Sequence, residues 1–424
     1  MSQPPARAED PKLWCVAIAL GFLAICLVRL GIPGKPYFDE VHYLPAARAL
    51  IEGSTWLNQE HPMLGKEIMA AGIALLGDSP WGWRLPGALA GSLALFAFMR
   101  AQWFATRTRF SVIATGLLLA TGFPMFVHAR IAMLDIYMVC FFAVALWQLA
   151  GAARQPEKGR WRLALAGIAL GLSMAAKWNT APLAVLPGLA FLALRLRATG
   201  WRFAFSRRGA PVPGITLAEA ALWLGLVPLA VYALTYLPAY SLTGSTLGEN
   251  GLVAQHWHML ELQESVKQPH PYQSTWPQWV LNLRAIWYLY ENVDGAQRGV
   301  LLIGNPLTML AGLPALAWAA WAAWRERRWD CAAAAVLFAA SLGMWIVLAK
   351  PVQFYYHYFL PSCFLLSALG MALDRLWRTG WRKLAPGTLA ASIALFGWFY
   401  PILSAAPLAG PQSFNHWMWL DSWR

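Results

Sequence analysis

Long runs of apolar residues recur along the whole chain, and they restrict its fold more than any other feature of the sequence. Apolar residues make up 58% of the 424 residues and charged residues only 12%, a balance that no soluble domain needs. A helix of about 20 apolar residues crosses the hydrocarbon core of a bilayer. The sequence therefore predicts an all-α polytopic membrane protein, in which residues 1–424 form a single membrane-embedded domain.

About eleven such runs can be placed, each near the length that a bilayer crossing requires. The polar stretch Lys177-Trp178-Asn179 divides the fifth run from the sixth. The first run lacks a small-residue cleavage signature, so we expect it to remain as a span. The expected spans are 13–32, 85–104, 110–127, 132–151, 162–177, 180–196, 217–238, 299–323, 331–349, 354–373 and 387–407. Two long loops, 33–84 and 239–298, then fall on the same side of the membrane.

The basic residues predict the orientation. The N-terminal segment and five short loops hold 20 of the 33 Lys and Arg residues, and all of them fall on one side. These residues are Arg7, Lys12, Arg107, Arg109, and those in Arg154 to Arg162, Arg195 to Arg208, Arg325 to Arg328 and Arg375 to Lys383. Short loops rich in Lys and Arg stay in the cytoplasm. We therefore expect a cytoplasmic N-terminus, a C-terminus on the opposite face and both long loops outside.

The sequence also argues against several other kinds of site and partner. The net charge of +13 is mostly a topology signal, and no basic patch with interleaved aromatic residues suggests a nucleic-acid partner. All five cysteines lie within expected spans, so the sequence predicts no disulfide framework. His256 and His258 stand two residues apart and point to different faces of a helix, so we expect no metal site. No glycine-rich phosphate loop occurs, and we expect no cofactor.

Ionisable residues open the first long loop. Asp39 and Glu40 follow the first span directly, and His61 and Lys66 come about twenty residues later. A carboxylate at a membrane boundary must be solvated, paired or used. Asp39 has a second interpretation, because Asp is also a favoured residue for capping a helix that begins there.

Two amphipathic helices are expected in this loop. One runs from Glu40 to Ile51, with Gly53 as its stop, and Pro45 leaves its start uncertain. The other runs from Pro62 to Leu76. Both could lie in the membrane interface and hold the ionisable residues over a cavity between the spans.

Further polar residues lie at other outer span ends. Arg130 and Asp135 flank the start of the fourth span, where a simple ion pair would also explain them. The remaining outer-face groups are Lys177, the segment with His270, Tyr272 and Gln273, and the segment with Lys350 and His357. A carboxylate within reach of a hydroxyl can act as a general base, and cations facing it can hold a phosphate. Together these groups indicate transfer from a lipid-borne phosphate to a hydroxyl on the outer face.

Four segments resemble the protein O-mannosyltransferases, which are inverting membrane glycosyltransferases of the GT-C class. The segments are Asp39-Glu40, His61-Pro62-Met63-Leu64-Gly65-Lys66, Arg130 to Asp135, and His270-Pro271-Tyr272-Gln273-Ser274. The resemblance runs from about residue 33 to 373 and includes the layout of spans. It implies a polyprenyl-phosphate-mannose lipid as donor, and Ser or Thr hydroxyls of secreted or membrane proteins as acceptors.

The resemblance also implies roles for individual residues. Asp39 would be the catalytic base, and Glu40 would support it or position the acceptor. Arg130 would bind the donor phosphate. The other residues expected on the donor side are His61, Lys66, Asp135, Lys350 and His357, and those expected near the acceptor are His270, Tyr272 and Gln273.

The chain departs from the family at two points, and two other functions stay open. Met63 stands where the family often has Pro, and the second long loop has no room for the soluble MIR domain of eukaryotic members. The resemblance is therefore to a bacterial form in the inner cell membrane. The alternatives are a GT-C enzyme that moves another lipid-linked sugar to lipid A or a glycan, and a transporter. Transporters tend to carry ionisable groups near mid-membrane, whereas here these groups gather at one face.

Overall fold

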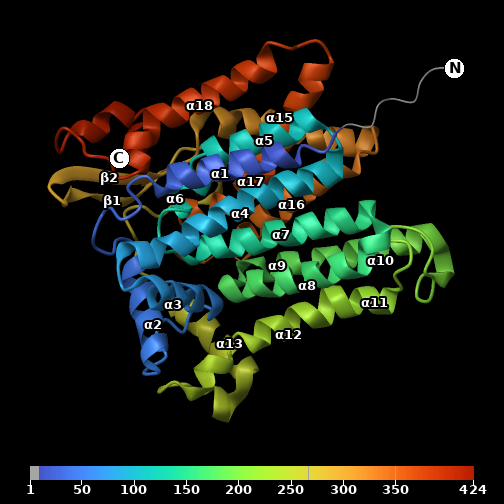
Figure 1. The fold of residues 1–424 in the computed structure, drawn as a ribbon, viewed down its shortest axis with the longest axis horizontal. Helices are drawn as coiled ribbons and strands as arrows, with labels where there is room; N and C mark the ends of the chain where they lie inside the picture. The colour runs from blue at the N-terminus through green and yellow to red at the C-terminus, as the bar shows by residue number, and fades with distance from the viewer. Residues whose placement is uncertain (1–8, 266, 349) are drawn as a thin grey trace.

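The computed structural model describes residues 9–265, 267–348 and 350–424, and it is a bundle of long helices with loops and short helices at its two ends (Figure 1). Arg7, which the charge argument included, lies outside the described residues. The first helices are α1 (Lys12–Leu27), α2 (Glu40–Glu52), α3 (Leu64–Leu76), α4 (Pro80–Thr106), α5 (Arg109–Thr121), α6 (Pro124–His128), α7 (Leu134–Arg154), α8 (Gly159–Ala176), α9 (Ala181–Ala184) and α10 (Leu186–Thr199). The later elements are α11 (Leu217–Ala221), α12 (Val227–Leu234), α13 (Leu247–Ser265), α14 (Trp276–Val280), β1 (Ile286–Val293), β2 (Ala296–Leu302), α15 (Pro306–Arg325), α16 (Trp329–Val347), α17 (Phe359–Arg378) and α18 (Leu384–Leu403).

The prediction of a helical membrane protein is confirmed. Within the described residues, eight helical stretches are long and apolar enough to cross a bilayer. They are Pro80–Thr106, Leu134–Arg154, Trp178–Arg202, Leu217–Ser241, Pro306–Arg325, Trp329–Val347, Tyr355–Arg378 and Leu384–Leu403. The shorter apolar helices α1 and α5, together with α8, stand where the other three spans were expected. The count of eleven crossings stays a prediction.

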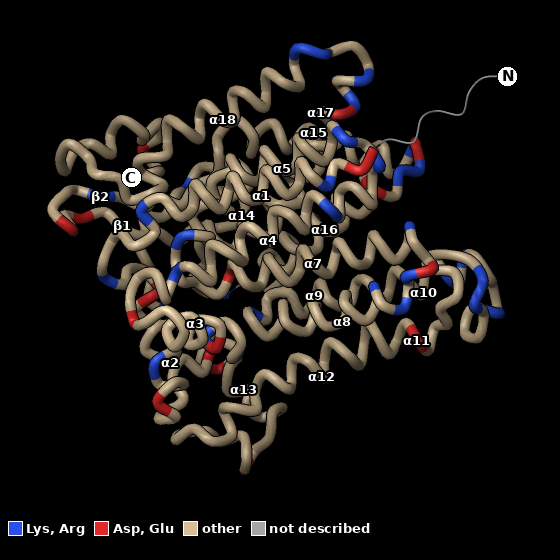
Figure 2. The backbone as a smooth tube through the Cα atoms, in the orientation of Figure 1, with Lys and Arg blue, Asp and Glu red and all other residues tan. Residues whose placement is uncertain are grey.

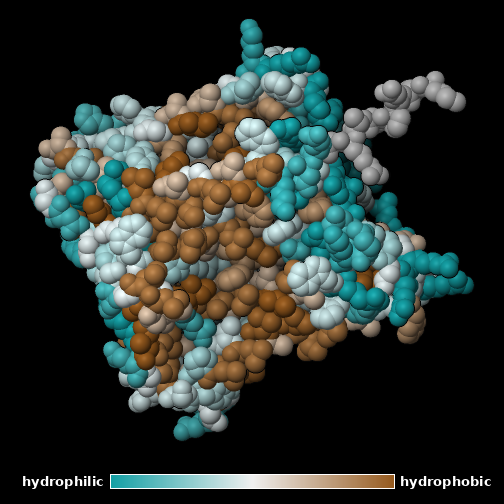
Figure 3. Space-filling model, in the orientation of Figure 1, coloured by the Kyte–Doolittle hydropathy of each residue, from teal (hydrophilic) through white to brown (hydrophobic). Residues whose placement is uncertain are grey.

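The surface has the pattern that a bilayer requires. An apolar band crosses the middle of the molecule, and hydrophilic side chains cover both ends (Figure 3). The stretch Leu217–Ser241 is mostly exposed although it is strongly apolar, so its natural surroundings are hydrocarbon. The buried centre of the bundle is formed by α4, α7 and α17.

A β-hairpin at the end of the second long loop was not predicted. β1 and β2 pair antiparallel, and residues 299–302 belong to β2 instead of starting the eighth span. The turn is Asp294-Gly295, where both residues have positive φ, 49° and 74°. A type I′ turn requires this conformation, and an Asp-Gly pair between two strand-like runs is its sequence signal.

Two expected spans are interrupted for local reasons. The first ends at Leu27 instead of 32, because Arg29 takes a left-handed φ of 57°. The third ends at Thr121, because Phe123 precedes Pro124 and lies outside the helical region with φ 79°. A residue before proline is disfavoured in helical conformation, so α6 begins anew at Pro124.

The helices expected in the first long loop are confirmed. α2 ends at Gly53, whose left-handed φ of 61° few other residues adopt without strain. Pro45 lies inside α2 without ending it. The break expected at Lys177 is also present, since its backbone is extended there (φ −157°, ψ 120°).

Candidate active site

A cavity of about 550 Å³ lies at the end of the bundle that carries the two long loops. Five segments line it: the first long loop, the short 3₁₀ helix Trp178–Thr180 together with α9, the C-terminal turns of α13, the end of α16, and the segment 350–357. Its ionisable lining residues are Asp39, His61, Lys177, Glu264, Lys350 and His357. Tyr43, Trp178, Trp345 and Tyr356 add aromatic surface to the wall. The fold therefore brings together residues that are more than 300 positions apart in the sequence.

Asp39 lines this cavity and directly precedes the first residue of α2. The preceding Phe38 takes a left-handed φ of 50°, and its ring stacks on Tyr288 of β1 with the ring centroids 3.9 Å apart. The carboxylate makes no capping hydrogen bond to α2 and instead accepts one from the Tyr43 hydroxyl at 3.5 Å. The interpretation of Asp39 as only a helix cap therefore has no support in this geometry.

The surroundings of Asp39 favour a base of moderate strength. Burial raises the pKa of its carboxyl from the usual range to about 6, and the charge of Asp135 also raises it. Lys177 opposes this rise in pKa. A carboxylate with a pKa near 6 is ionised at neutral pH and still accepts a proton more readily than an ordinary Asp.

Lys177 faces the same cavity and is held there by Asp135. Its Nζ donates to both carboxylate oxygens of Asp135, at 2.9 and 2.8 Å, and both side chains are nearly fully buried. The ammonium also lies 5.1 Å from the centre of the Tyr356 ring. Asp135, which was expected to contact the donor, thus holds the cation in place.

Three other expected residues line the cavity. Lys350 is half-buried, and burial, together with the nearby Lys177, lowers the pKa of its ammonium. Burial also holds the pKa of His61 well below its usual value, so its ring is neutral at pH 7. The Nδ1 of His61 is buried and has no hydrogen-bond partner in the described part of the chain. His357 packs on Trp345, with the ring centroids 3.9 Å apart.

The structure places Glu40 outside the cavity wall, next to Asp39 in the chain. Its side chain is fully buried and binds Arg84 through two hydrogen bonds of 2.8 Å. It also accepts hydrogen bonds from the backbone N–H groups of Ala132 at 2.9 Å and Tyr37 at 3.2 Å. All of these bonds are within the protein, so Glu40 joins the first loop to α4 and does not line the cavity.

Arg130 is also placed differently from the expectation. Its guanidinium is buried and donates to the backbone carbonyls of Cys26, Val28, Arg29 and Ser404, three of them from the end of α1. It does not line the cavity. The reason is that α1 ends five residues earlier than expected, which leaves carbonyl groups without helical partners.

Lys66 likewise supports a loop. Its Nζ donates to the carbonyls of Asn58 at 2.6 Å and His61 at 2.9 Å, and burial lowers the pKa of the ammonium to about 7. Lys66 therefore positions the turn that carries His61 and does not line the cavity itself.

The segment expected near the acceptor forms a turn outside the cavity wall. The backbone N–H of His270 donates to the side chain of Gln273 at 3.2 Å, and the N–H of Tyr272 donates to the His270 ring at 3.1 Å. The next residue, Ser274, donates its N–H to the carbonyl of Gln353 at 2.8 Å. This turn therefore supports the segment that leads into Tyr356 and His357.

Sequence reasoning left out several lining residues. Gln263 and Glu264 come from the last turn of α13, and no motif marked them. Tyr356 stood in a segment whose aromatic residues a membrane-interface belt also explains. In the described ranges, no three His, Cys, Asp or Glu side chains are grouped closely enough to hold a metal ion.

Two sequence profiles of one family match the chain. The profile described as "Dolichyl-phosphate-mannose-protein mannosyltransferase" matches residues 60–218. The profile described as "C-terminal four TMM region of protein-O-mannosyltransferase" matches residues 250–423.

Curated relatives match nearly end to end. The polyprenol-phosphate-mannose--protein mannosyltransferase of Mycolicibacterium smegmatis is 27% identical, over 99% of this chain and 94% of the relative. The enzyme of the same name from Mycobacterium tuberculosis is 27% identical, over 92% of this chain and 87% of the relative.

Solved structures share the fold. A chain of the S. cerevisiae protein O-mannosyltransferase Pmt1-Pmt2 complex bound to the sugar donor matches with a TM-score of 0.80 and 15% identity, over 98% of this chain and 93% of that one. ArnT from Cupriavidus metallidurans bound to undecaprenyl phosphate matches with a TM-score of 0.58 and 17% identity, over 88% of this chain and 62% of that one.

The helical bundle has the GT-C fold of these solved structures, and the two family profiles and the curated relatives define the class as a membrane-embedded glycosyltransferase. Within that class, the chain belongs to the protein O-mannosyltransferase family.

Proposed function

We propose that this chain moves mannose from a polyprenyl-phosphate-mannose lipid to Ser or Thr hydroxyls of secreted or membrane proteins, with inversion at the sugar. The observation that carries the proposal is the position of Asp39. It is a carboxylate with a pKa of about 6, in a cavity whose wall also presents Lys177 and Lys350.

These groups divide the chemistry between them. The acceptor hydroxyl oxygen forms a bond to the anomeric carbon, and its proton passes to the Asp39 carboxylate. The bond from that carbon to the phosphate oxygen breaks, and the lipid phosphate leaves with the electron pair. Lys177 and Lys350 stabilise the negative charge that grows on this phosphate. The cations of the cavity thus replace Arg130 in the proposed donor site.

The cavity wall also offers a path for the lipid chain. Met344, Val347 and Leu348 line it from the end of α16, and Val347 and Leu348 are largely exposed, at 80% and 63%. The apolar wall therefore continues onto the outer surface of the bundle, where the polyprenyl chain can remain in hydrocarbon. The loop charges support an inner-membrane enzyme with this cavity on the periplasmic face.

The direct test uses the purified full-length protein with labelled polyprenyl-phosphate mannose and a Ser/Thr peptide. We expect label on the peptide, and none on a matched peptide in which alanine replaces the hydroxyl residues. A second reaction replaces the peptide by lipid A or a glycan, and a third uses a donor with another sugar. Transfer only in one of these two reactions would overturn the proposed acceptor or donor.

A further inference from the structure

A second cavity, of about 470 Å³, lies at the opposite end of the bundle from Asp39. α16 begins at this cavity with Trp329 and ends at the first one with Val347, and α17 ends here with Arg378. Because an α-helix rises 1.5 Å per residue, helices of this length separate the two cavities by roughly 30 Å. The proposed transfer reaction uses none of the residues at this end.

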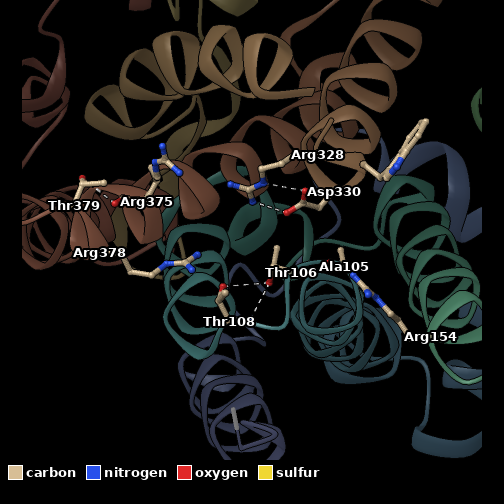
Figure 4. Close-up of a pocket in the computed structure, with 10 residues that line it drawn as sticks. Ala105, Thr106, Thr108, Arg154, Arg328, Asp330, Arg375, Arg378 and Thr379 are labelled. Carbon is tan, nitrogen blue, oxygen red and sulfur yellow. Dashed lines mark hydrogen bonds and ion pairs between the residues drawn. The ribbon is translucent and has the colours of Figure 1, made fainter. Parts of the chain in front are cut away.

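Four arginines surround this second cavity, which we call the arginine cavity. Figure 4 shows Arg375 and Arg378 of α17 on one side, Arg154 of α7 on the opposite side and Arg328 between them. Thr106 and Thr108 line the same space, and the Thr108 hydroxyl donates a hydrogen bond to the Thr106 hydroxyl at 3.3 Å (Figure 4). The remaining lining residues are Ala105, Trp329, Asp330 and Thr379, so one acidic side chain lines it against four cations.

Arg154 has no acidic partner among the ion pairs of the described residues. It donates to the backbone carbonyls of Phe104 and Ala105 through Nε and one Nη, both at 2.9 Å. These bonds hold the guanidinium at the rim, next to the end of α4. A guanidinium has five N–H donors, so its other Nη remains available to a ligand.

The other three arginines keep donors as well. Arg328 binds Asp330 through Nε and one Nη. Arg375 and Arg378 of α17 are half-exposed, and each uses one Nη in an ion pair. Arg375 pairs with Glu326 at 3.3 Å, and Arg378 pairs with Asp374. The carboxylates of Asp330, Glu326 and Asp374 orient the three guanidinium groups. The N–H groups that these ion pairs do not use remain available to a ligand.

The arginine cavity lies at the end of the bundle that carries several exposed tryptophans. Trp324, Trp329 and Trp381 stand at the same end of the bundle and are 62% to 69% exposed. Tryptophan is enriched at the depth of lipid headgroups. The same end carries most of the Lys and Arg residues (Figure 2).

We propose that the arginine cavity binds the phosphate of an anionic phospholipid headgroup from the leaflet opposite to the transfer site. Arginine forms paired hydrogen bonds to phosphate oxygens, and basic pockets between membrane helices bind such headgroups. The tryptophans favour a lipid over a soluble phosphate, because they place the opening where headgroups lie.

The test compares the full-length protein in detergent with the double variant Arg375→Gln/Arg378→Gln. Native mass spectrometry would count bound lipids during titration with cardiolipin, with phosphatidylglycerol or, as the zwitterionic reference, with phosphatidylcholine. The matched control is Arg202→Gln/Arg207→Gln, which also removes two positive charges, from exposed positions outside the cavity. Inorganic pyrophosphate is the soluble probe, and thermal unfolding without lipid checks that each variant is folded.

We expect Arg375→Gln/Arg378→Gln to bind the anionic lipids at least tenfold more weakly than wild type, and Arg202→Gln/Arg207→Gln to bind them as wild type does. Equal lipid binding by Arg375→Gln/Arg378→Gln and wild type would overturn the proposal. Equal loss in Arg202→Gln/Arg207→Gln would also overturn it, because general charge would then be the cause. Displacement of the lipid by pyrophosphate at equal concentration would assign the site to a soluble phosphate and overturn the lipid source.

Discussion

At the scale of single residues, Asp39 and Glu40 are adjacent in the chain but have opposite surroundings. Asp39 makes one long hydrogen bond and faces the cavity. Glu40 is fully buried, and its oxygens bind Arg84 and two backbone N–H groups. Removing the charge of Asp39 should therefore affect the transfer rate, whereas removing the charge of Glu40 should affect stability.

Asp39→Asn should reduce the mannosyl transfer rate by about 10²- to 10⁴-fold, the usual contribution of a general base. Its thermal stability should stay close to wild type, because no helix-capping bond is lost. Glu40→Gln is the control. It should mainly lower the free energy of unfolding, by about 3–5 kcal/mol, because it breaks a buried ion pair. Near-normal transfer by Asp39→Asn would show that Asp39 is not the base.

The pH profile of transfer follows from the raised pKa of Asp39, about 6. The base works only when ionised, so kcat/KM should rise with pH through about 6 and level off above pH 7. Each unit below the pKa should reduce the rate about tenfold. A profile that is flat between pH 5 and 7, measured where the protein stays folded, would contradict an Asp39 base with this pKa.

Lys350 and Arg130 test the revised donor site. Lys350→Gln should weaken binding of the lipid donor at least tenfold with little change in thermal stability, because Lys350 lines the cavity. Arg130→Gln should instead lower the unfolding temperature, because its guanidinium binds carbonyls of the fold. The reverse pattern, with donor affinity lost only in Arg130→Gln, would return the phosphate site to Arg130.

At the scale of elements, the cavity depends on how helices bring distant segments together. Lys177 stands at the end of α8, and Asp135 stands in the first turn of α7. α8 also packs closely on the chain around α12. A Cβ on Gly167 would lie 1.9 Å from the carbonyl oxygen of Trp223, closer than any side chain permits.

Gly167→Leu should therefore force α8 away from its neighbour and lower stability by about 1–3 kcal/mol, as overpacking does. Gly188→Leu in α10 is the control, because no atom lies within 4 Å of the added Cβ. Thermal unfolding of the two purified variants measures the difference. Equal unfolding temperatures would mean that α8 does not pack as described.

At the scale of the whole molecule, the long helices separate two chemically different ends. One end has the cavity with Asp39, and the other has most of the basic residues (Figure 2). From the positive-inside rule we expect the basic end to face the cytoplasm.

Single cysteines in a cysteine-free background test this orientation. His270→Cys should react with an impermeant maleimide added to intact spheroplasts, because His270 is exposed at the end that carries the long loops. Arg207→Cys, exposed at the basic end, should react only after permeabilisation. Labelling of position 207 in intact spheroplasts would reverse the topology.

The features that could be predicted from the sequence are those that depend on local chemistry. Apolar runs of bilayer length predicted the helical bundle, because hydrocarbon leaves the backbone no partners outside the helix. Gly53 predicted the end of α2, whereas the role of Asp39 at the membrane boundary stays a prediction. The Asp294-Gly295 turn depends on an equally local signal, because both positions of a type I′ turn require positive φ.

Only the tertiary structure decided which charges meet. Glu40 binds Arg84, 44 positions away, and Asp135 binds Lys177, 42 positions away. Arg130 binds carbonyls at the ends of α1 and α18, so it was unavailable to the cavity. The physical reason is that a buried charge needs a partner, and the packing of helices determines which partner lies within reach.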